Sequence, residues 1–148
     1  MAPLRLSRRP VIAGLAGLVG ALATSMTACQ RKARCGQCGM VLDPASRWYV
    51  ELALADGSRR GFDAPRCAFT AWRGPLREAS ELFARGHYNG AILPSASLVF
   101  GLGSDVIGPM GPDLVPVEPE HGATFAREHN ARSMLRAAEV TAATLGGL

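Results

Sequence analysis

The sequence lacks an apolar run long enough to cross a membrane as a helix. Residues 11–23 form a run rich in glycine and alanine, but its thirteen residues fall short of the ~20 that a spanning helix needs. Arg5, Arg8 and Arg9 precede it, and this order is typical of an export signal. We therefore expect a cleaved lipoprotein-type signal over residues 1–28, with the paired arginines of twin-arginine export, and a mature protein that works outside the cytoplasm.

Beyond that signal the chain also lacks an excess of charge of either sign. Three of the 16 Lys and Arg residues lie in the signal, which leaves 13 against 12 Asp and Glu, a net charge of +1. A nearly neutral domain without a basic stripe has no electrostatic footprint for nucleic acid. No internal repeat and no long linker interrupts the rest of the chain, so we expect one domain over residues 35–148 and no nucleic-acid partner.

Cysteine is scarce, with four residues in 148. Cys29 follows the small residues ATSMTA, as in a lipobox, where the cysteine is acylated and anchors the chain to a membrane; an ordinary signal with an incidental cysteine is the alternative. Residues 29–34 would then be a lipid-anchored tether. Cys35, Cys38 and Cys67 remain, and three cysteines cannot all pair within one chain. At least one thiol is therefore free or metal-bound in an oxidising compartment.

The first half of the domain carries clear patterns of secondary structure. Residues 47–54 alternate apolar and polar side chains, which predicts a half-buried strand. An Asp-Gly turn separates them from residues 59–62, which we expect to pair with them as a hairpin. Residues 63–73 begin with an Asp and a Pro and end before a Gly-Pro pair, as a helix does. A second helix is expected over residues 75–86.

The second half repeats the order of strands and helix more weakly. Residues 97–100 and 113–117 are short apolar strands around a loop rich in glycine and proline. Residues 118–130 carry acids at their start and predict a helix, whereas residues 133–140 fit a strand or a helix equally well. The whole pattern predicts a small α+β domain of two units, each a strand pair followed by a helix (a ββα unit).

The Cys-x-x-Cys motif of Cys35 and Cys38 is compatible with several chemistries. A structural zinc site needs four N or S ligands, and Cys67 could supply the third. The chain has three histidines that could supply the fourth: His87, His121 and His129. A zinc site of this kind would leave Met40, which follows the motif at once, without a role.

Three other interpretations of the cysteine- and glycine-containing motifs are weaker. The Cys-x-x-Cys of a disulfide oxidoreductase follows a buried strand, but the basic segment QRKAR precedes Cys35. No histidine follows Cys38 directly, as covalent haem attachment requires. The stretch 101–108 fails as a dinucleotide fingerprint because Val106 stands where the third glycine belongs.

Binding of a soft metal accounts for the most features. Thiolate and thioether donors select Cu(I) over harder ions, and Cys38 and Met40 offer one of each on either side of a glycine. Met110 lies between prolines and glycines on a loop, which favours a third donor over a methionine that fills the core. Cys35 is a less certain ligand, and Cys67 a secondary thiol that could instead form a disulfide with Cys35. A copper site with so few ligands is open to exchange, which suits handing the metal on.

Three stretches together resemble one known family. They are CGQCGMVLD, VELALADGSRRGFDAPRC and GSDVIGPMGPDLVPVEPEHGATFAREHN, and they resemble NosL, the copper chaperones of nitrous oxide reductase assembly. The resemblance implies a periplasm-facing lipoprotein, anchored through Cys29, that binds Cu(I) and passes it to nitrous oxide reductase. It also implies a copper-assembly membrane transporter as a partner and a fold like that of organomercurial lyase.

That fold likeness suggests one enzymatic alternative. In an organomercurial-lyase-like activity, thiols act together with a carboxyl group, and Asp63 and Cys67 could supply parts of it. The simpler roles are an N-cap for Asp63 and a half-buried helix thiol for Cys67, and the sequence favours these. We therefore predict a metal-binding protein and not an enzyme.

Overall fold

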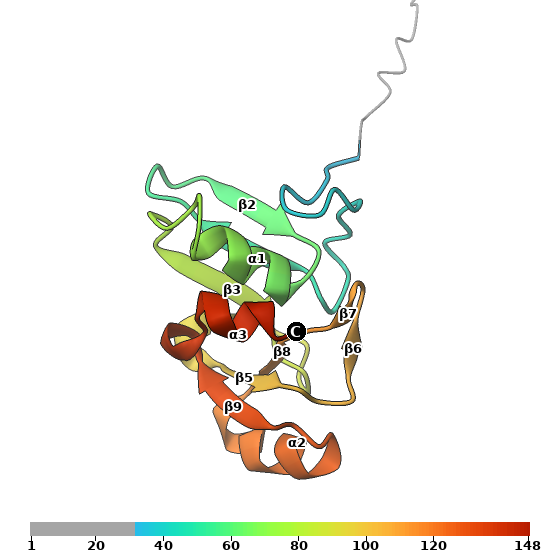
Figure 1. The fold of residues 1–148 in the computed structure, drawn as a ribbon. Helices are drawn as coiled ribbons and strands as arrows, with labels where there is room; N and C mark the ends of the chain where they lie inside the picture. The colour runs from blue at the N-terminus through green and yellow to red at the C-terminus, as the bar shows by residue number, and fades with distance from the viewer. Residues whose placement is uncertain (1–31) are drawn as a thin grey trace, which may run out of the picture. The chain divides into compact units, whose positions relative to one another are not determined.

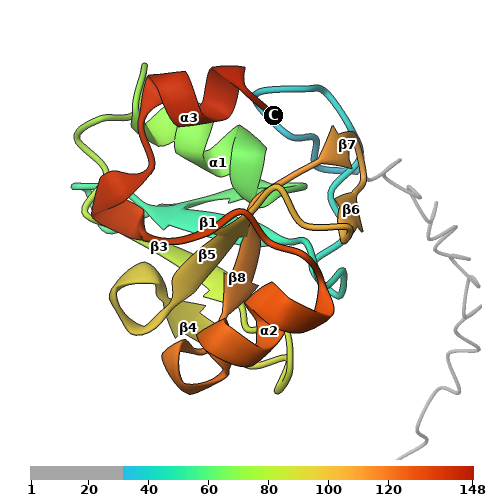
Figure 2. The same cartoon turned by 60° about the horizontal axis from the view of Figure 1, so that its bottom comes forward.

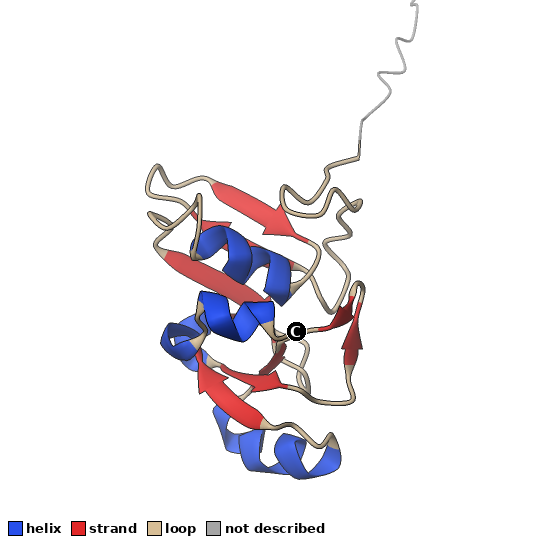
Figure 3. Ribbon diagram, viewed as in Figure 1, coloured by secondary structure: helices blue, strands red, loops and turns tan. Residues whose placement is uncertain are grey.

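The computed structural model describes residues 32–148 (Figure 1). The expected signal and Cys29 lie outside the described residues. The described part is built of short antiparallel strands and short helices, in a four-stranded sheet, a three-stranded sheet and a two-stranded ribbon (Figure 3). No helix in this part combines the length and the apolar character needed to span a membrane.

The four-stranded sheet has the order β2-β1-β3-β4. In chain order, its strands are β1 (Val50–Ala53), β2 (Arg59–Phe62), β3 (Glu81–Arg85) and β4 (Ile92–Pro94). The predicted alternation of β1 is confirmed, because Val50 and Leu52 are 1% and 0% exposed. The predicted hairpin is confirmed as well: β1 pairs with β2, and Gly57 has the positive φ of +83° that its turn requires.

The predicted helix over residues 75–86 is wrong, because its second half forms β3. Leu82 lies opposite Leu52 in the antiparallel pair of β1 and β3. Leu82 and Ala84 are both fully buried, so the apolar side chains repeat every second residue, as in a strand. The backbone groups along the free edge of β1 pair with a second strand. This tertiary pairing overrides the helical spacing of the apolar residues in the segment 75–86.

Helix α1 (Pro65–Trp72) forms where the sequence predicts it. Pro65 begins it at the position where a missing N–H costs nothing. Its buried face includes Phe69, whose ring meets Phe100 edge-on at a centroid distance of 5.0 Å. Phe100 belongs to the second sheet, and both rings lie in one hydrophobic core with Leu52 and Leu82 of the first sheet.

The three-stranded sheet has the order β8-β5-β9, with β5 (Val99–Leu102), β8 (Val115–Val117) and β9 (Ser133–Arg136). The undecided segment after residue 132 is therefore a strand at its start. Helix α2 (Gly122–Glu128) covers this sheet with the fully buried Phe125, as predicted.

Several short elements complete the chain. Helix α3 (Ala142–Gly146) packs beside α1 (Figures 1 and 2), and no pattern in the sequence predicted it. Short 3-10 turns lie between β4 and β5 (η1, Ser95–Ser97), between β8 and α2 (η2, Pro119–His121) and between β9 and α3 (η3, Ala137–Glu139).

The loop rich in glycine and proline contains a tight hairpin. Strands β6 (Ile107–Gly108) and β7 (Gly111–Pro112) pair with each other, and Pro109 and Met110 form the turn between them. The α+β class with antiparallel sheets is confirmed. The finer division into two ββα units is not established, because β3 and β4 complete the first sheet and the β6–β7 hairpin interrupts the second half.

Candidate metal centre

The Cys-x-x-Cys motif lies in a tight loop. The Cys35 N–H donates to the Met40 carbonyl at 2.8 Å, and the Gly39 N–H donates to the Cys35 carbonyl at 2.9 Å. Gly39 has a φ of +79°, a conformation that other residues rarely adopt. The chain therefore folds back on itself within six residues, which brings Cys38 close to Cys35.

The end of β2 and the start of α1 bring in two further groups. Phe62 fixes the end of β2 in the core, and Asp63 follows it with only 6% of its surface exposed. The N-cap of α1 is Ala64, with no side-chain cap, so the predicted capping role of Asp63 is wrong. Its carboxylate instead accepts a hydrogen bond from the Cys38 thiol at 3.1 Å. Cys67 lies in the first turn of α1 and is also buried.

Four side chains thus form what we call the thiol group: Cys35, Cys38, Asp63 and Cys67. One ligand atom from each lies within 4.8 Å of all the others. Ligands that bind one ion at ~2.3 Å stand at most ~4.6 Å apart, so the group has nearly the dimensions of a single-ion site. All three cysteines are free thiols.

Protonation in the thiol group follows from burial. Burial, aided by the hydrogen bond to Asp63, raises the pKa of Cys38 to about 11, although the Met40 N–H opposes the shift. Burial and neighbouring negative charge also raise the pKa of Cys67. For Asp63, burial acts to raise the pKa, but hydrogen bonds from the thiols outweigh it and the pKa is lowered. At neutral pH Asp63 is therefore a carboxylate and Cys38 and Cys67 are thiols, whose protons a metal ion would displace.

One atom of the group has no partner. The Oδ2 atom of Asp63 is buried without a hydrogen bond, and such an acceptor costs about 1–3 kcal/mol when it is left unpaired. A cation at the centre of the thiol group would offset this cost. The donor set and this free oxygen therefore fit a metal ion.

The two methionines lie differently. The Met110 sulfur is 4.0 Å from the Cys67 sulfur, so the β6–β7 hairpin brings it to the edge of the thiol group. Met40 takes part through its backbone, and within residues 32–148 its sulfur accepts no hydrogen bond from a thiol, whereas that of Met110 does. Their side chains are 40% (Met40) and 49% (Met110) exposed. Met40 remains a predicted ligand that would have to turn toward the site.

The thiol group opens to solvent through a cleft of about 590 Å³ between the Cys38 loop, α1, α3 and the β6–β7 hairpin, which we call the thiol cleft. Its lining residues are Gln37, Cys38, Arg66, Cys67, Thr70, Arg73, Met110, Ala142, Leu145 and Gly146.

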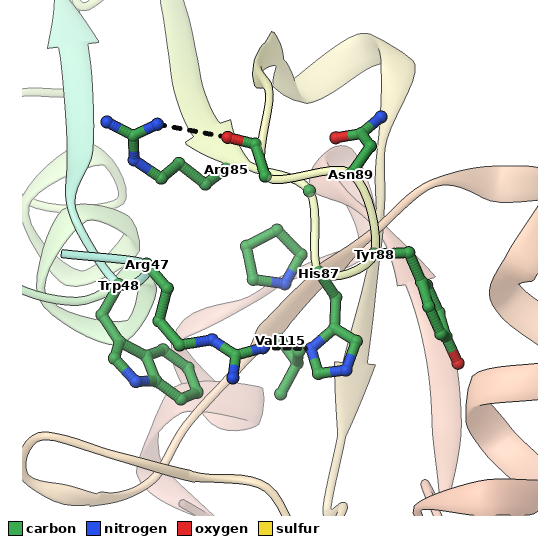
Figure 4. Close-up of a pocket in the computed structure, with 10 residues that line it drawn as sticks. Arg47, Trp48, Arg85, His87, Tyr88, Asn89 and Val115 are labelled. Carbon is green, nitrogen blue, oxygen red and sulfur yellow. Dashed lines mark hydrogen bonds between the residues drawn. The ribbon is translucent and has the colours of Figure 1, made fainter. Parts of the chain in front are cut away.

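The histidines gather elsewhere. Figure 4 shows His87 facing Arg47 in a separate pocket of about 410 Å³. The Arg47 guanidinium donates to Nδ1 of His87 at 2.8 Å. Burial and the charge of Arg47 lower the pKa of His87, and its ring packs against His129. In the described part of the chain no histidine belongs to the thiol group. The fold therefore does not bring a histidine to the cysteines as the fourth zinc ligand.

Asp63 takes the place that the zinc hypothesis gave to a histidine. The sequence contains one sign of this, a carboxylate four residues before a cysteine, but the same spacing suits a helix cap. Only the fold shows that Asp63 turns toward Cys38.

The fold and this centre define a small α+β protein with a candidate metal site made of thiols and one carboxylate. Residues 26–145 match the NosL family model, and the chain belongs to the NosL family. The resemblance noted in the sequence is thereby confirmed.

Among solved structures, the fold is similar to that of the copper chaperone NosL from Shewanella denitrificans, with a TM-score of 0.63 and 18% identity, over 75% of this chain and 91% of that chain. No curated protein matches the chain. The solved relative is described as a copper chaperone, in agreement with the prediction of a metal-binding protein that is not an enzyme.

Proposed function

We propose that the protein is a Cu(I) metallochaperone. The observation that carries this proposal is the convergence of sulfur donors: three free thiols within 4.8 Å of one another and the Met110 thioether 4.0 Å from Cys67. Soft donors of this kind select Cu(I). The similarity in fold to a copper chaperone supports the same conclusion.

Cys38 is the central ligand in this proposal. It contacts Asp63, lines the thiol cleft and shares its loop with Met40. Met110 and Met40 supply neutral thioethers, which suit a monovalent ion because they add no further negative charge to a buried site. Cys35 and Cys67 lie deeper, and we assign them secondary roles as ligands or as supports of Cys38.

Delivery follows from the exposure of the thioethers. A ligand at the mouth of the thiol cleft can be replaced by a ligand of another protein without unfolding of the core. By resemblance to the family, we propose nitrous oxide reductase as the recipient and a copper-assembly membrane transporter as a partner. Copper binding and delivery would take place in the periplasm, at the surface of a membrane.

The test is anaerobic loading with Cu(I) against a Cu(I)-specific chelator. We expect one tightly bound ion per chain, an affinity that falls in the Cys38→Ala variant, and transfer to copper-free nitrous oxide reductase. Absence of Cu(I) binding would refute the proposal, and binding without transfer would refute the choice of recipient.

The membrane anchor is a separate proposal, motivated by the small residues before Cys29. Cys29→Ser should release the protein from membranes into the soluble fraction and leave Cu(I) binding intact. A variant that stays fully membrane-bound would rule out the lipid anchor.

One observation favours a second candidate function, structural zinc binding: the thiol group contains four potential ligands, as tetrahedral zinc requires. The two functions separate by competition. Zinc that is retained during Cu(I) loading and is needed for folding would support the structural role.

A further inference from the structure

The thiol cleft carries positive charge that the proposed copper site does not use. Arg66 and Arg73 line it, and no acidic side chain does. The Arg73 guanidinium donates only to the carbonyls of Val140 and Ala137. Within residues 32–148 the Arg66 guanidinium has neither a hydrogen bond nor an ion pair. Two cations therefore stand beside the sulfur ligands without a carboxylate at salt-bridge distance.

Apolar side chains lie on the two segments that supply the methionines. Val41 follows Met40 and is 42% exposed, and Ile107 of β6 is 57% exposed. Figures 1 and 2 both show the segment that follows residue 31 lying beside the β6–β7 hairpin. The loop and the hairpin that carry the methionines thus expose apolar side chains, and the cleft that Cys38 and Met110 line carries two arginines without a carboxylate at salt-bridge distance.

We infer that the thiol cleft is a docking groove for a segment of a copper-accepting protein, and that this segment carries carboxylates and apolar side chains beside its own sulfur ligand. The carboxylates would meet Arg66 and Arg73, the apolar side chains would cover Val41 and Ile107, and the sulfur would reach Met110. This inference rests on the proposed function, since the segment is defined as the acceptor of the copper.

The two arginines set the sign of the partner's charge. Opposite charge at the rim of an interface mainly accelerates association and selects the partner, and the effect weakens as salt screens it. A chain with a net charge of +1 beyond its signal has too little positive field for nucleic acid. An anionic lipid surface is the remaining competitor, and the experiment includes it.

The experiment uses two synthetic peptides of equal length as copper acceptors. Each has a central methionine and flanking leucines; one adds aspartates and the other lysines. The whole protein, loaded with Cu(I), should transfer the ion to the aspartate peptide roughly tenfold faster than to the lysine peptide at low salt. Added salt should shrink the difference.

Arg66→Glu is the decisive variant, because this side chain holds no other element in place. It should abolish the preference for the aspartate peptide and leave the Cu(I) affinity unchanged. Arg66→Gln, which removes the charge without reversing it, should reduce the preference by a smaller factor. The matched control is Arg127→Glu on α2, which lies at the far end of the fold from α1 in both views (Figures 1 and 2), and it should keep the preference.

Three results would overturn the inference: equal rates for the two peptides, equal effects of Arg66→Glu and Arg127→Glu, or Arg66-dependent binding to anionic phosphatidylglycerol vesicles without a peptide preference. Failure of the proposed function has a different signature. A protein that binds no Cu(I) would still allow peptide binding to the copper-free form to be measured by fluorescence polarisation, and the same Arg66-dependent preference is expected there.

Discussion

The sulfur atoms of the candidate site occupy two contrasting environments. Cys35 and Cys67 are 3% and 4% exposed, whereas Met40 and Met110 are 40% and 49% exposed. The thiols are held by the core through β2, α1 and a tight loop, and the thioethers are carried on two surface segments. In the proposed function this contrast separates two tasks, since buried ligands would retain an ion and ligands at the surface would allow its exchange.

The contrast also concerns oxidation. A thiol in an oxidising compartment is consumed when it forms a disulfide with a reactive partner, and burial limits access to Cys35 and Cys67. A thioether cannot form a disulfide, so an exposed methionine is not lost by this route, although it can be oxidised to the sulfoxide. Burial of the two thiols and thioethers at the surface therefore both reduce the loss of donors to disulfides.

The largest expected effect is the loss of Cys38, which lies between the two environments. Loss of a group that supports a metal ligand costs roughly ten- to hundredfold in affinity. Cys38→Ala removes a proposed ligand itself and should weaken Cu(I) binding by more than this. Cys35→Ala and Cys67→Ala should each cost less. Chelator competition measures all three. Equal losses would contradict the central role of Cys38 and indicate a site of three equivalent thiolates.

Asp63→Asn should have the next largest effect. Its carboxylate holds the Cys38 thiol at 3.1 Å, and an amide of the same shape cannot supply a negative charge. We expect a loss of roughly tenfold in Cu(I) affinity, with far-UV circular dichroism unchanged. Glu51→Gln on β1, whose carboxylate pairs with Arg59 at the surface, is the control and should bind Cu(I) like the wild type.

Met110→Leu tests the exposed environment. Leucine keeps the volume and apolar character but removes the sulfur, so the melting temperature of the copper-free protein should stay nearly constant. Cu(I) should bind more weakly, and the stabilisation that binding confers should shrink. Met40→Leu is the matched comparison, and we expect a smaller effect because only the Met110 sulfur is hydrogen-bonded to a thiol in the described part of the chain. A copper-free protein that melts early with its Cu(I) affinity intact would mark Met110 as a packing residue.

Local patterns in the sequence were sufficient to predict β1, β2, α1 and the class of the fold. The alternation of Val50 and Leu52 and the turn at Gly57 depend on neighbouring residues alone. The helix predicted over residues 75–86 is wrong because the apolar spacing there suits a helix, while the pairing of Leu82 with Leu52 depends on a strand far away in the chain. Propensity carries no information on such a partner.

The candidate site divides in the same way. The soft donors Cys38, Met40 and Met110 could be proposed from residue chemistry and the stiff turn, and their role as ligands remains a prediction. The place of Asp63 could not be foreseen, because its side chain had a local explanation as a helix cap. The convergence of Met110 on Cys67 required the β6–β7 hairpin, which the sequence suggested only as a loop.

The smallest expected effect on Cu(I) affinity concerns Asp113, the residue that joins the exposed hairpin to the buried thiols. The Asp113 carboxylate accepts hydrogen bonds from the N–H groups of Arg66 at 2.8 Å and Leu114 at 2.7 Å. It thereby ties the end of the hairpin to the first turn of α1, next to Cys67. Burial raises its pKa to about 6, above the value of an unfolded chain.

The sign of the pH dependence follows from that shift. A carboxyl group with a raised pKa in the native state contributes stability that is complete below the unfolded pKa of ~3.9 and is lost as the pH rises through about 6. Two pKa units correspond to about 3 kcal/mol.

Asp113→Asn keeps the acceptor oxygen but does not titrate. Between about pH 4 and pH 7, the free energy of unfolding of Asp113→Asn should therefore rise relative to that of the wild type. Urea unfolding at each pH measures this difference. The Cu(I) affinity of the variant should stay unchanged. A flat difference for Asp113→Asn would mean that this carboxyl group does not titrate in that range, and a loss of Cu(I) affinity would mean that the hairpin and the thiols are more tightly coupled than their contrast in exposure suggests.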